Sequence, residues 1–285
     1  MSYVQYKRCS DVDMSTVFKA FTIGFSDYII RLEMDEDFFT KRFFEAEGNS
    51  RETSFIAFSG YTPVGFIMGG IKDYEGIKTM RCGTLCIHPD FRGLGVSQEL
   101  FKLHREEAIK KGCKQLFLEV ILGNDRAINF YKKLGYEKIY KLKYFSLKDI
   151  SKLERYNVND ASIKEVGLEE LKTLRSSLLD VHINWQNDIE CIEKYLGQHI
   201  FIADIKDDIA GALCISNTGK INFLWIPMEY RNKSIATALI KNAVKNLNLS
   251  KISISFPSSA SLEGYLKHME FEKDSLEQYE MYLTL

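Results

Sequence analysis

A glycine-rich turn between an apolar strand and an amphipathic helix has the clearest chemical potential in this sequence. The segment reads L-C-I-H-P-D-F-R-G-L-G-V-S from Leu85 to Ser97. Gly93 and Gly95 lack Cβ atoms, so the backbone can adopt positive φ and approach a ligand closely. The N–H groups that open the following helix have no partner within it, and the helix dipole adds positive charge there. The pattern predicts a site for an anion such as a pyrophosphate, with Arg92 adding a charged contact.

A second segment could bring a hydroxyl group close to the molecule that carries this anion. It reads N-D-R-A-I-N-F-Y-K-K-L-G-Y from Asn124 to Tyr136, and it predicts a short helix that carries Tyr131 and ends at Gly135. The glycine turn alone would also suit an ordinary strand-to-helix connection. It is neither a P-loop nor a dinucleotide fingerprint, because G-K-[ST] and a third glycine are absent.

Together the two segments resemble the conserved blocks of the GNAT acyltransferase superfamily. The first block is R-x-x-G-x-G/A, and its marked positions are filled here by Arg92, Gly95 and Ser97. Ser97 departs slightly from the pattern, but it is small and pyrophosphate binding is expected to survive. The second block is L-E-V at Leu118 to Val120, followed by N-x-x-A-x-x-F-Y-x-x-x-G-Y. The resemblance covers most of residues 1–148 and implies an enzyme that uses acetyl-CoA to acetylate a primary amine.

The resemblance also implies which residues contact the cofactor. Backbone groups of the strand pair with the pantetheine arm, and one N–H polarises the thioester carbonyl as in an oxyanion hole. The turn holds the pyrophosphate, while Asn124 contacts the pantetheine or orders its own turn. The implied cofactor-binding residues are Leu85, Cys86, Ile87, Arg92, Gly93, Leu94, Gly95, Val96, Ser97, Asn124 and Tyr131. No metal is required.

Two side chains are candidate catalytic groups. In the family, the tyrosine that matches Tyr131 lies near the CoA sulfur and protonates the departing thiolate; packing under the sheet, as expected for Phe130, is the alternative. Glu119 interrupts an apolar strand, where an unpaired carboxylate is costly to bury. The ribosomal-protein N-terminal acetyltransferases have a similar L-E-V…N…Y arrangement and use this glutamate as a base. A salt-bridged or solvated Glu119, or a base acting through water, remains open.

Three other side chains are weaker candidates for chemistry. His88 precedes a proline at a strand end, which favours a positional role. Cys86 lies in mid-strand, where a core cysteine is more common than a nucleophile. His104, on the long helix, is expected to be solvated or structural.

The order of predicted elements indicates a mixed α/β fold. Strands alternate with amphipathic helices in the first half in the order β-α-α-β-β-β-α-β-α-β, which is the order of a GNAT domain. The predicted helices and strands lie at residues 3–9, 11–25, 36–47, 54–58, 64–71, 79–88, 96–111, 116–122, 125–134 and 137–147.

The second half repeats the first weakly. The run F-L-W-I-P-M-E-Y-R-N-K-S-I-A echoes the glycine turn, and Y-L-K-H-M-E-F-E-K echoes the second block. Ser234 replaces Gly95 and a serine resists positive φ; Leu266 replaces Tyr131, and Glu119 has no clear counterpart. A long helical region is expected over residues 168–195.

We therefore predict two tandem GNAT-like domains. These are a catalytic domain at 1–148 and a degenerate copy at 156–285, joined by a charged connector at 149–155. The second domain is expected to shape the substrate cleft, mediate assembly or support the first.

Composition excludes several other classes of protein. The chain has 285 residues, 45% of them apolar and 27% charged, which suits two folded domains. A net charge of −1 gives no case for a nucleic-acid or membrane partner. No apolar run can span a bilayer, and the N-terminus lacks a signal-peptide core. Six scattered cysteines without C-x-x-C suggest neither zinc nor disulfides and fit the cytoplasm. An oligomer is possible but not indicated.

The amine that accepts the acetyl group is the least defined element of this prediction. Residues 18–44 are expected to line the pocket for this amine. The acidic residues of that segment could attract a cationic amine or form a solvated face. His182 and Trp185 could line a shared cleft, although packing suits them better. The sequence does not separate a peptide N-terminus from a small-molecule amine. The alternative function is a non-catalytic acyl-CoA-binding sensor or assembly module. The aromatic and acidic residues of the segment 18–44, which is expected to line the amine pocket, are Phe18, Phe21, Phe25, Asp27, Tyr28, Asp35, Glu36, Asp37, Phe38 and Phe39.

Overall fold

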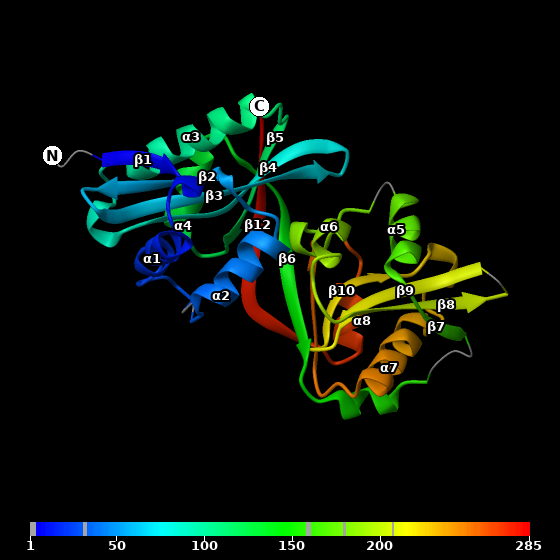
Figure 1. Ribbon diagram of the computed structural model, residues 1–285. Coiled ribbons are helices and arrows are strands. Elements are labelled where there is room, and N and C mark those ends of the chain that lie inside the picture. The colour runs from blue at the N-terminus through cyan, green and yellow to red at the C-terminus, as the bar shows by residue number, and fades with distance from the viewer. Residues whose placement is uncertain (1–3, 31–32, 158–160, 179–180, 207) are drawn as a thin grey trace. The chain divides into compact units, whose positions relative to one another are not determined.

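The computed structural model describes residues 4–30, 33–157, 161–178, 181–206 and 208–285. The chain divides into two compact units, both of mixed α/β structure (Figure 1). Unit 1 contains residues 1–139 together with 278–285, and unit 2 contains residues 140–277. Within the described residues, no helix is long and apolar enough to cross a membrane.

Unit 1, apart from the last strand at residues 137–147, most of which lies in unit 2, contains the elements expected of the first half. Its strands are β1 (Val4–Arg8), β2 (Ser50–Ser59), β3 (Thr62–Tyr74), β4 (Ile77–Ile87), β5 (Gln115–Ile121) and the end of β12 (Glu272–Thr284). Its helices are α1 (Met14–Gly24), α2 (Glu36–Phe39), α3 (Val96–Lys110) and α4 (Asp125–Lys133). The predicted helix at 36–47 is α2 continued by a π-helix over Thr40–Ala46.

The sheet of unit 1 runs in the order β1-β2-β3-β4-β5-β12. Only β4 and β5 pair in parallel; the other neighbours are antiparallel. One face is covered by α3 and α4, which bury Leu100, Phe101 and Ile128 against it. The other is covered by α1 and α2 through Phe21 and Phe39. Of the two catalytic candidates, Glu119 therefore lies on a strand of a sheet that is covered on both faces, and Tyr131 lies on α4, which covers one of them.

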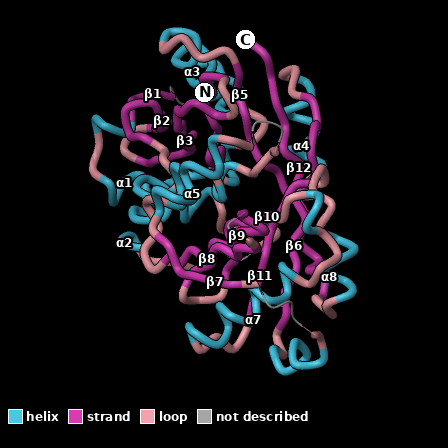
Figure 2. The backbone as a smooth tube through the Cα atoms, turned by 90° about the vertical axis from the view of Figure 1, so that its right-hand side faces the viewer, coloured by secondary structure: helices cyan, strands magenta, loops and turns pink. Residues whose placement is uncertain are grey.

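Unit 2 repeats this architecture. Its strands are β6 (Glu137–Leu147), β7 (Ser162–Val166), β8 (Gln198–Ile205), β9 (Asp208–Ser216), β10 (Lys220–Trp225) and β11 (Ile252–Pro257), in the order β6-β11-β10-β9-β8-β7. Its helices are α5 (Leu168–Ser176), α6 (Ile189–Ile192), α7 (Ile235–Leu247) and α8 (Glu263–His268). One face packs on α7 and the other on α5 and α6 (Figure 2). The connector forms a 3₁₀-helix over Ile150–Arg155.

The predicted long helix at 168–195 is wrong. Helix α5 ends at Ser176, a 3₁₀ turn occupies Trp185–Asn187, and α6 has a single turn. Asp188 caps a new helix, α6, by accepting from the Ile189 N–H, and the Asn187 side-chain amide is drawn to the Ser255 carbonyl of β11 at 3.1 Å. Such local bonds compete with a continuous helix.

The two repeats exchange their last strands. In unit 1, β5 pairs with the C-terminal strand β12, so that Phe117 faces Tyr282 and Gln115 faces Thr284. In unit 2, β11 pairs with β6, the strand that follows α4 in the chain. The boundary between the units consequently falls inside β6 and inside β12. The proposed domains 1–148 and 156–285 follow chain order, whereas the compact units follow this exchange.

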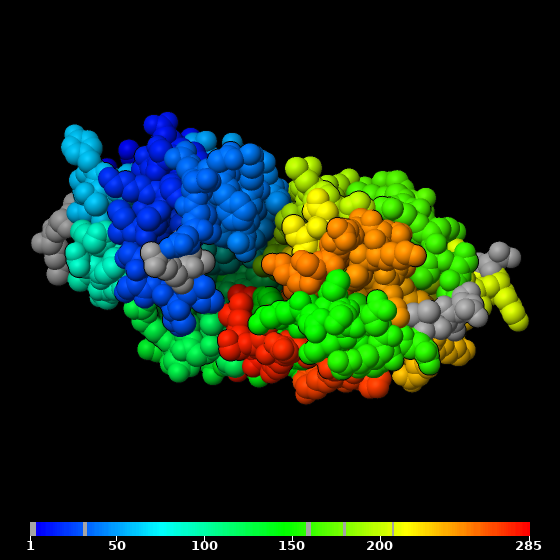
Figure 3. Space-filling view, turned by 90° about the horizontal axis from the view of Figure 1, so that it is seen from below, coloured from blue at the N-terminus to red at the C-terminus, as the bar shows by residue number. Residues whose placement is uncertain are grey.

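Helix α7 of unit 2 packs beside the connector. The Lys241 ammonium donates to the Tyr156 carbonyl at 3.1 Å. Figure 3 shows the orange surface of α7 next to the green surface of this segment. The connector therefore belongs to the folded body of unit 2 instead of forming a free linker.

Candidate active site

The candidate site of unit 1 lies where β4 and β5 separate. Their pairing ends at Cys82 and Leu118, although β4 continues to Ile87 and β5 to Ile121. The edge of β4 beyond this point is therefore not taken up by β5. The backbone N–H and C=O groups of Leu85–Ile87 that point away from β3 lie on this edge, which suits pairing with an extended ligand; the Ile87 carbonyl already accepts from Arg92.

A β-bulge accompanies the separation. The register between β3 and β4 shifts by one residue at Gly83, and such a bulge bends and twists its strand. A Cβ atom at Gly83 would come within 2.3 Å of the Asn49 Oδ1 atom. Asn49 cannot easily move, because its Nδ2 atom donates to the Phe43 carbonyl at 2.8 Å. Only glycine fits, so the strand turns away from β5 at a fixed point.

The glycine turn follows directly after β4. A 3₁₀ turn at Pro89–Phe91 leads to Gly93 with φ 78° and Gly95 with φ 85°, and α3 begins at Val96. A Cβ atom placed on either glycine would meet nothing within 4 Å. The helix N-terminus therefore faces open space with its N–H groups exposed, as an anion site requires. Leu94, at the tip, is 68% exposed.

Arg92 is held within the protein. Its Nε donates to the Ile87 carbonyl and its Nη2 to the Gly24 carbonyl, both at 3.2 Å. The guanidinium also makes a two-pronged ion pair with Asp27, at 2.5 and 2.6 Å. This hydrogen-bonded arginine holds the pKa of Asp27 below its usual range. Arg92 thus ties the end of α1 to the turn.

Asn124 orders the start of α4. Its Oδ1 atom accepts from the Ala127 N–H at 3.2 Å, which caps the helix. The Tyr28 hydroxyl lies close to the same side chain. Of the two roles expected for Asn124, ordering the turn is therefore visible in the structure.

Tyr131 is almost fully buried, with 7% exposure, on the face covered by α3 and α4. Its ring packs against Phe130 and Tyr136 at 5.4 and 5.7 Å between centroids. Its hydroxyl lies close to the Cys82 thiol, within the same buried cluster. Burial raises the pKa of Tyr131 well above its usual value, so the hydroxyl keeps its proton at neutral and moderately alkaline pH. The ring packs as a core aromatic, while the hydroxyl reaches the last β4–β5 pair.

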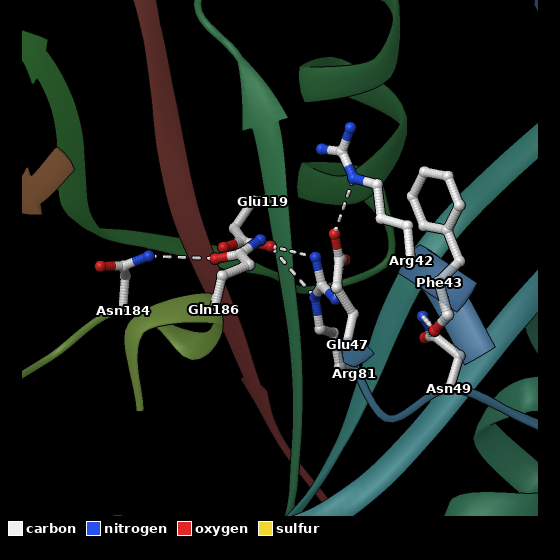
Figure 4. A network of polar contacts seen from close by, with 8 residues as sticks. All are labelled: Arg42, Phe43, Glu47, Asn49, Arg81, Glu119, Asn184 and Gln186. Carbon is white, nitrogen blue, oxygen red and sulfur yellow. Dashed lines mark hydrogen bonds and ion pairs between the residues drawn. The ribbon is translucent and has the colours of Figure 1, made fainter. Parts of the chain in front are cut away.

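Glu119 forms a buried ion pair (Figure 4). Its Oε2 atom accepts from Nη2 and Nε of Arg81, at 2.7 and 3.0 Å. Arg81 also pairs with Glu47 at 2.8 Å, and Glu47 pairs with Arg42 at 3.3 Å. The Glu119 side chain is only 3% exposed. Of the alternatives that the sequence left open, the salt-bridged glutamate is the one present.

Gln186 and Asn184, also drawn in Figure 4, belong to unit 2. Their side chains hydrogen-bond to each other at 3.0 Å.

The three weaker candidates, His88, Cys86 and His104, have contacts or burial that fit structural roles. His88 accepts from the Asp90 N–H through Nδ1 at 3.2 Å, which supports a positional role. Cys86 is a core residue, and burial raises the pKa of its thiol. His104 is completely buried, so of its two expected roles, solvated or structural, the structural one is present. In the part of the chain that is described, no group of three or more His, Cys, Asp or Glu side chains could hold a metal.

Most acidic side chains of the segment 18–44, which was expected to line the amine pocket, already have partners within the protein. Asp35 caps α2 by accepting from the Phe38 N–H at 2.8 Å, and Asp37 pairs with Lys41 at 2.7 Å. The aromatic residues of this segment mostly form one core cluster around Phe21. Most of these residues therefore cap helices, form ion pairs or pack in the core.

The turn of unit 2 keeps the shape of the glycine turn. Asn232 has φ 60° and Ser234 has φ 59°, so both occupy the left-handed region that Gly93 and Gly95 occupy in unit 1. The expectation that serine would resist this conformation is wrong, because the turn imposes it. The sequence divergence has therefore not destroyed the backbone of the second turn.

A cavity of about 710 Å³ adjoins this second turn. It lies among residues of unit 2 alone, between the end of β10, the start of α7 and α8. Its lining includes Trp225, Arg231, Ser234, Thr237, Ser259 and Tyr265. His182 also lines it and stacks on Tyr140 at 4.1 Å, whereas Trp185 is buried in packing.

Sequence reasoning missed the two residues that touch the catalytic candidates. Arg81 and Cys82 are neighbours on β4, and neither belongs to a recognised motif. A signal for Arg81 existed: it is a charge inside an apolar strand, and so is Glu119 on the neighbouring strand. Two opposite charges inside adjacent buried strands predict an ion pair.

Family models match both halves of the chain. A model described as acetyltransferase (GNAT) family matches residues 18–136, and one described as acetyltransferase (GNAT) domain matches residues 167–285.

Curated relatives match a shorter part. An acetyltransferase of Pectobacterium atrosepticum is 37% identical over 76 residues, which are 27% of this chain and 51% of the relative. An acetyltransferase of Sodalis glossinidius is 38% identical over 74 residues, or 26% and 49% of the two chains. The chain thus spans about half the length of the curated relatives it matches.

Solved structures share the fold across the whole chain. A tandem GNAT protein from the clavulanic acid biosynthesis pathway has a TM-score of 0.67 at 14% identity, covering 99% of this chain and 98% of the other. A putative acetyltransferase from Pyrococcus horikoshii has a TM-score of 0.66 at 17% identity, with 99% and 89% coverage. These likenesses show the fold alone. Together with the two family matches, they establish that the chain belongs to the GNAT acetyltransferase family and carries two GNAT domains in tandem.

Proposed function

We propose that unit 1 is an acetyl-CoA-dependent N-acetyltransferase that moves the acetyl group to a primary amine by direct attack in a ternary complex. The observation that carries the proposal is the pair of left-handed glycines, Gly93 and Gly95, facing open space at the start of α3. They adjoin a strand edge that β5 does not occupy. This arrangement suits a ligand with an anionic pyrophosphate and an extended amide-bearing arm.

The residues present fit acetyl-CoA, which supplies the activated acetyl group. Backbone N–H groups from Gly93 to Ser97 would hold the pyrophosphate, and the backbone of Leu85–Ile87 would pair with the pantetheine arm. The sequence assigned Asn124 and Tyr131 to this site as well. Both lie on α4, which packs on the same face of the sheet as α3.

Glu119 and Tyr131 have complementary parts in the proposed chemistry. The amine nitrogen forms the new C–N bond, and the C–S bond breaks with its electron pair on sulfur. Glu119 takes the proton that the amine loses, directly or through a water molecule, and Tyr131 gives a proton to the sulfur. The ion pair with Arg81 holds the Glu119 carboxylate in place, and burial keeps the proton on the Tyr131 hydroxyl.

The proposed acceptor is a small-molecule or peptide amine. All six cysteines are buried thiols outside any disulfide, which suits the reducing cytoplasm that we propose as its location. The test is thiol release from acetyl-CoA across a panel of amines, with the acetylated amine identified by mass. Turnover that requires an amine and disappears in Gly95→Val supports the proposal. No turnover with any amine class, in a protein that binds CoA, would favour a binding role.

A second candidate function belongs to unit 2, and its cavity is the observation that favours it. The cavity adjoins a turn of the correct backbone shape, with Asn232 and Ser234 in the left-handed region. No tyrosine occupies the position of Tyr131, where Leu266 is completely buried. We propose that unit 2 binds an acyl-CoA without catalysing transfer, so that the chain combines an enzyme with a binding module.

A further inference from the structure

The Asp27 carboxylate takes up hydrogen-bond donors of Arg92, the arginine of the glycine turn. A guanidinium has five N–H donors, and four hydrogen bonds from Arg92 are made within unit 1. Two of the four go to the Asp27 carboxylate in the forked geometry that arginine also uses for phosphate. A phosphate group and Asp27 would therefore seek the same donors.

Unit 2 contains the same arginine without the carboxylate. The Nε atom of Arg231 donates to the Ile226 carbonyl at 3.1 Å, as that of Arg92 does to Ile87. Among the described residues, no carboxylate pairs with Arg231. Lys233 adds a second positive charge where unit 1 has Leu94.

This comparison separates two explanations of Asp27. The second turn adopts the same left-handed conformations at Asn232 and Ser234, although its arginine has no acidic partner. A carboxylate is thus not required to shape the turn. Asp27 is 53% exposed, and an ion pair with so exposed a partner contributes little to stability. A structural role accounts poorly for this residue.

We infer that Asp27 is an internal competitor for the cofactor's phosphates: it occupies Arg92 in the free protein and is displaced when the pyrophosphate binds. The inference rests on the proposed function, because it takes the turn of unit 1 to be a CoA site. Asp27 then sets the affinity of unit 1 for the cofactor. The turn of unit 2 lacks this control, since no carboxylate among the described residues pairs with Arg231 or Lys233.

The test is calorimetric titration with CoA, which needs no turnover. We follow the site that Gly95→Val abolishes and compare the wild type with Asp27→Asn. The variant should bind CoA about 3- to 10-fold more tightly, an effect that corresponds to the worth of an exposed ion pair plus one repulsive charge. Asp37→Asn is the matched control, because it removes the same charge from a pair with Lys41 on the same segment. Its affinity should equal that of the wild type.

A double-mutant cycle distinguishes competition from general charge repulsion. In the Arg92→Gln background, Asp27→Asn should give a clearly smaller gain in CoA affinity, since no shared donor remains and only the removal of one repulsive charge contributes. An equal gain in both backgrounds, or no gain in the Asp27→Asn single variant, overturns the inference while leaving a CoA site in place. Absence of any site that Gly95→Val removes would instead overturn the proposed function.

Discussion

Arg81 and Cys82 are consecutive residues of β4, and each contacts one of the two candidate catalytic side chains. Arg81 pairs with Glu119 on the face covered by α1 and α2, and Cys82 contacts Tyr131 on the face covered by α3 and α4. Side chains of successive strand residues point to opposite faces. The base and acid of the proposed reaction thus approach the point where β4 and β5 separate from opposite sides of the sheet.

Replacement of Glu119 by glutamine tests the base. Glutamine keeps an oxygen acceptor for Arg81 but cannot take a proton, so kcat/KM should fall by about 10²- to 10⁴-fold and lose its rise with pH. The measurement is a pH profile of kcat/KM once an acceptor is known. Glu47→Gln is the matched control, because it disturbs the same Arg81 guanidinium. If both variants keep the wild-type profile, Glu119 does not take the proton.

His104 should limit stability in acid. It is completely buried, and both ring nitrogens lack a hydrogen-bond partner in the described part of the chain. Burial lowers its pKa to about 3, so below about pH 6.5 only the unfolded state gains a proton. Stability should therefore fall as pH decreases from 6.5, by up to about 1.4 kcal/mol per pH unit.

The His104→Leu variant should lack this part of the pH dependence. It should also be more stable by about 1–3 kcal/mol at pH 7, because the buried polar nitrogens are removed. Urea unfolding at pH 5 and pH 7 measures both effects. An equal loss of stability between the two pH values in variant and wild type would show that His104 does not titrate on unfolding.

CoA should bind at two places in the chain. Valine is strongly disfavoured at positive φ, so Gly95→Val should abolish the site in unit 1 and Ser234→Val the site in unit 2. Calorimetry should give two sites in the wild type and one in each variant. A single site that only Gly95→Val removes would restore the expectation of a degenerate second domain and exclude the proposed binding module.

The repeated architecture of the chain could be predicted because its signals are local. The glycine turn, the capping Asn124 and the amphipathic α3 each act within a few residues, and the structure contains all three. The tandem organisation followed from repeated spacing alone.

The strand exchange could not be predicted in this way. Both β6 and β12 follow a short helix and have similar patterns, so nothing local indicates which β5-like strand each will join. The conformation of Ser234 was also missed, because local preference disfavours it and the surrounding turn overrides that preference.

The motif residues of the candidate site could be predicted from the sequence, but the residues that contact them could not. Tyr131 and Glu119 stood out through family spacing and through a charge in an apolar strand. Cys82, Arg81 and Asp27 are brought to the site by tertiary packing over large sequence separations. Asp27 in particular belongs to an acidic segment that would suit an exposed face equally well.

Kinetics of Tyr131→Phe test most directly the claim that unit 1 carries out the reaction. The change removes one hydroxyl and keeps the ring, and Tyr265→Phe makes the same change in unit 2, where that hydroxyl contacts Thr237 at 3.2 Å. Steady-state thiol release should give a kcat lower by about 10- to 10³-fold in Tyr131→Phe, with CoA affinity preserved, since proton donation matters only in the transition state. The kcat of Tyr265→Phe should match the wild type. Wild-type kcat in Tyr131→Phe together with a large loss in Tyr265→Phe would place the chemistry in unit 2 and contradict the assignment.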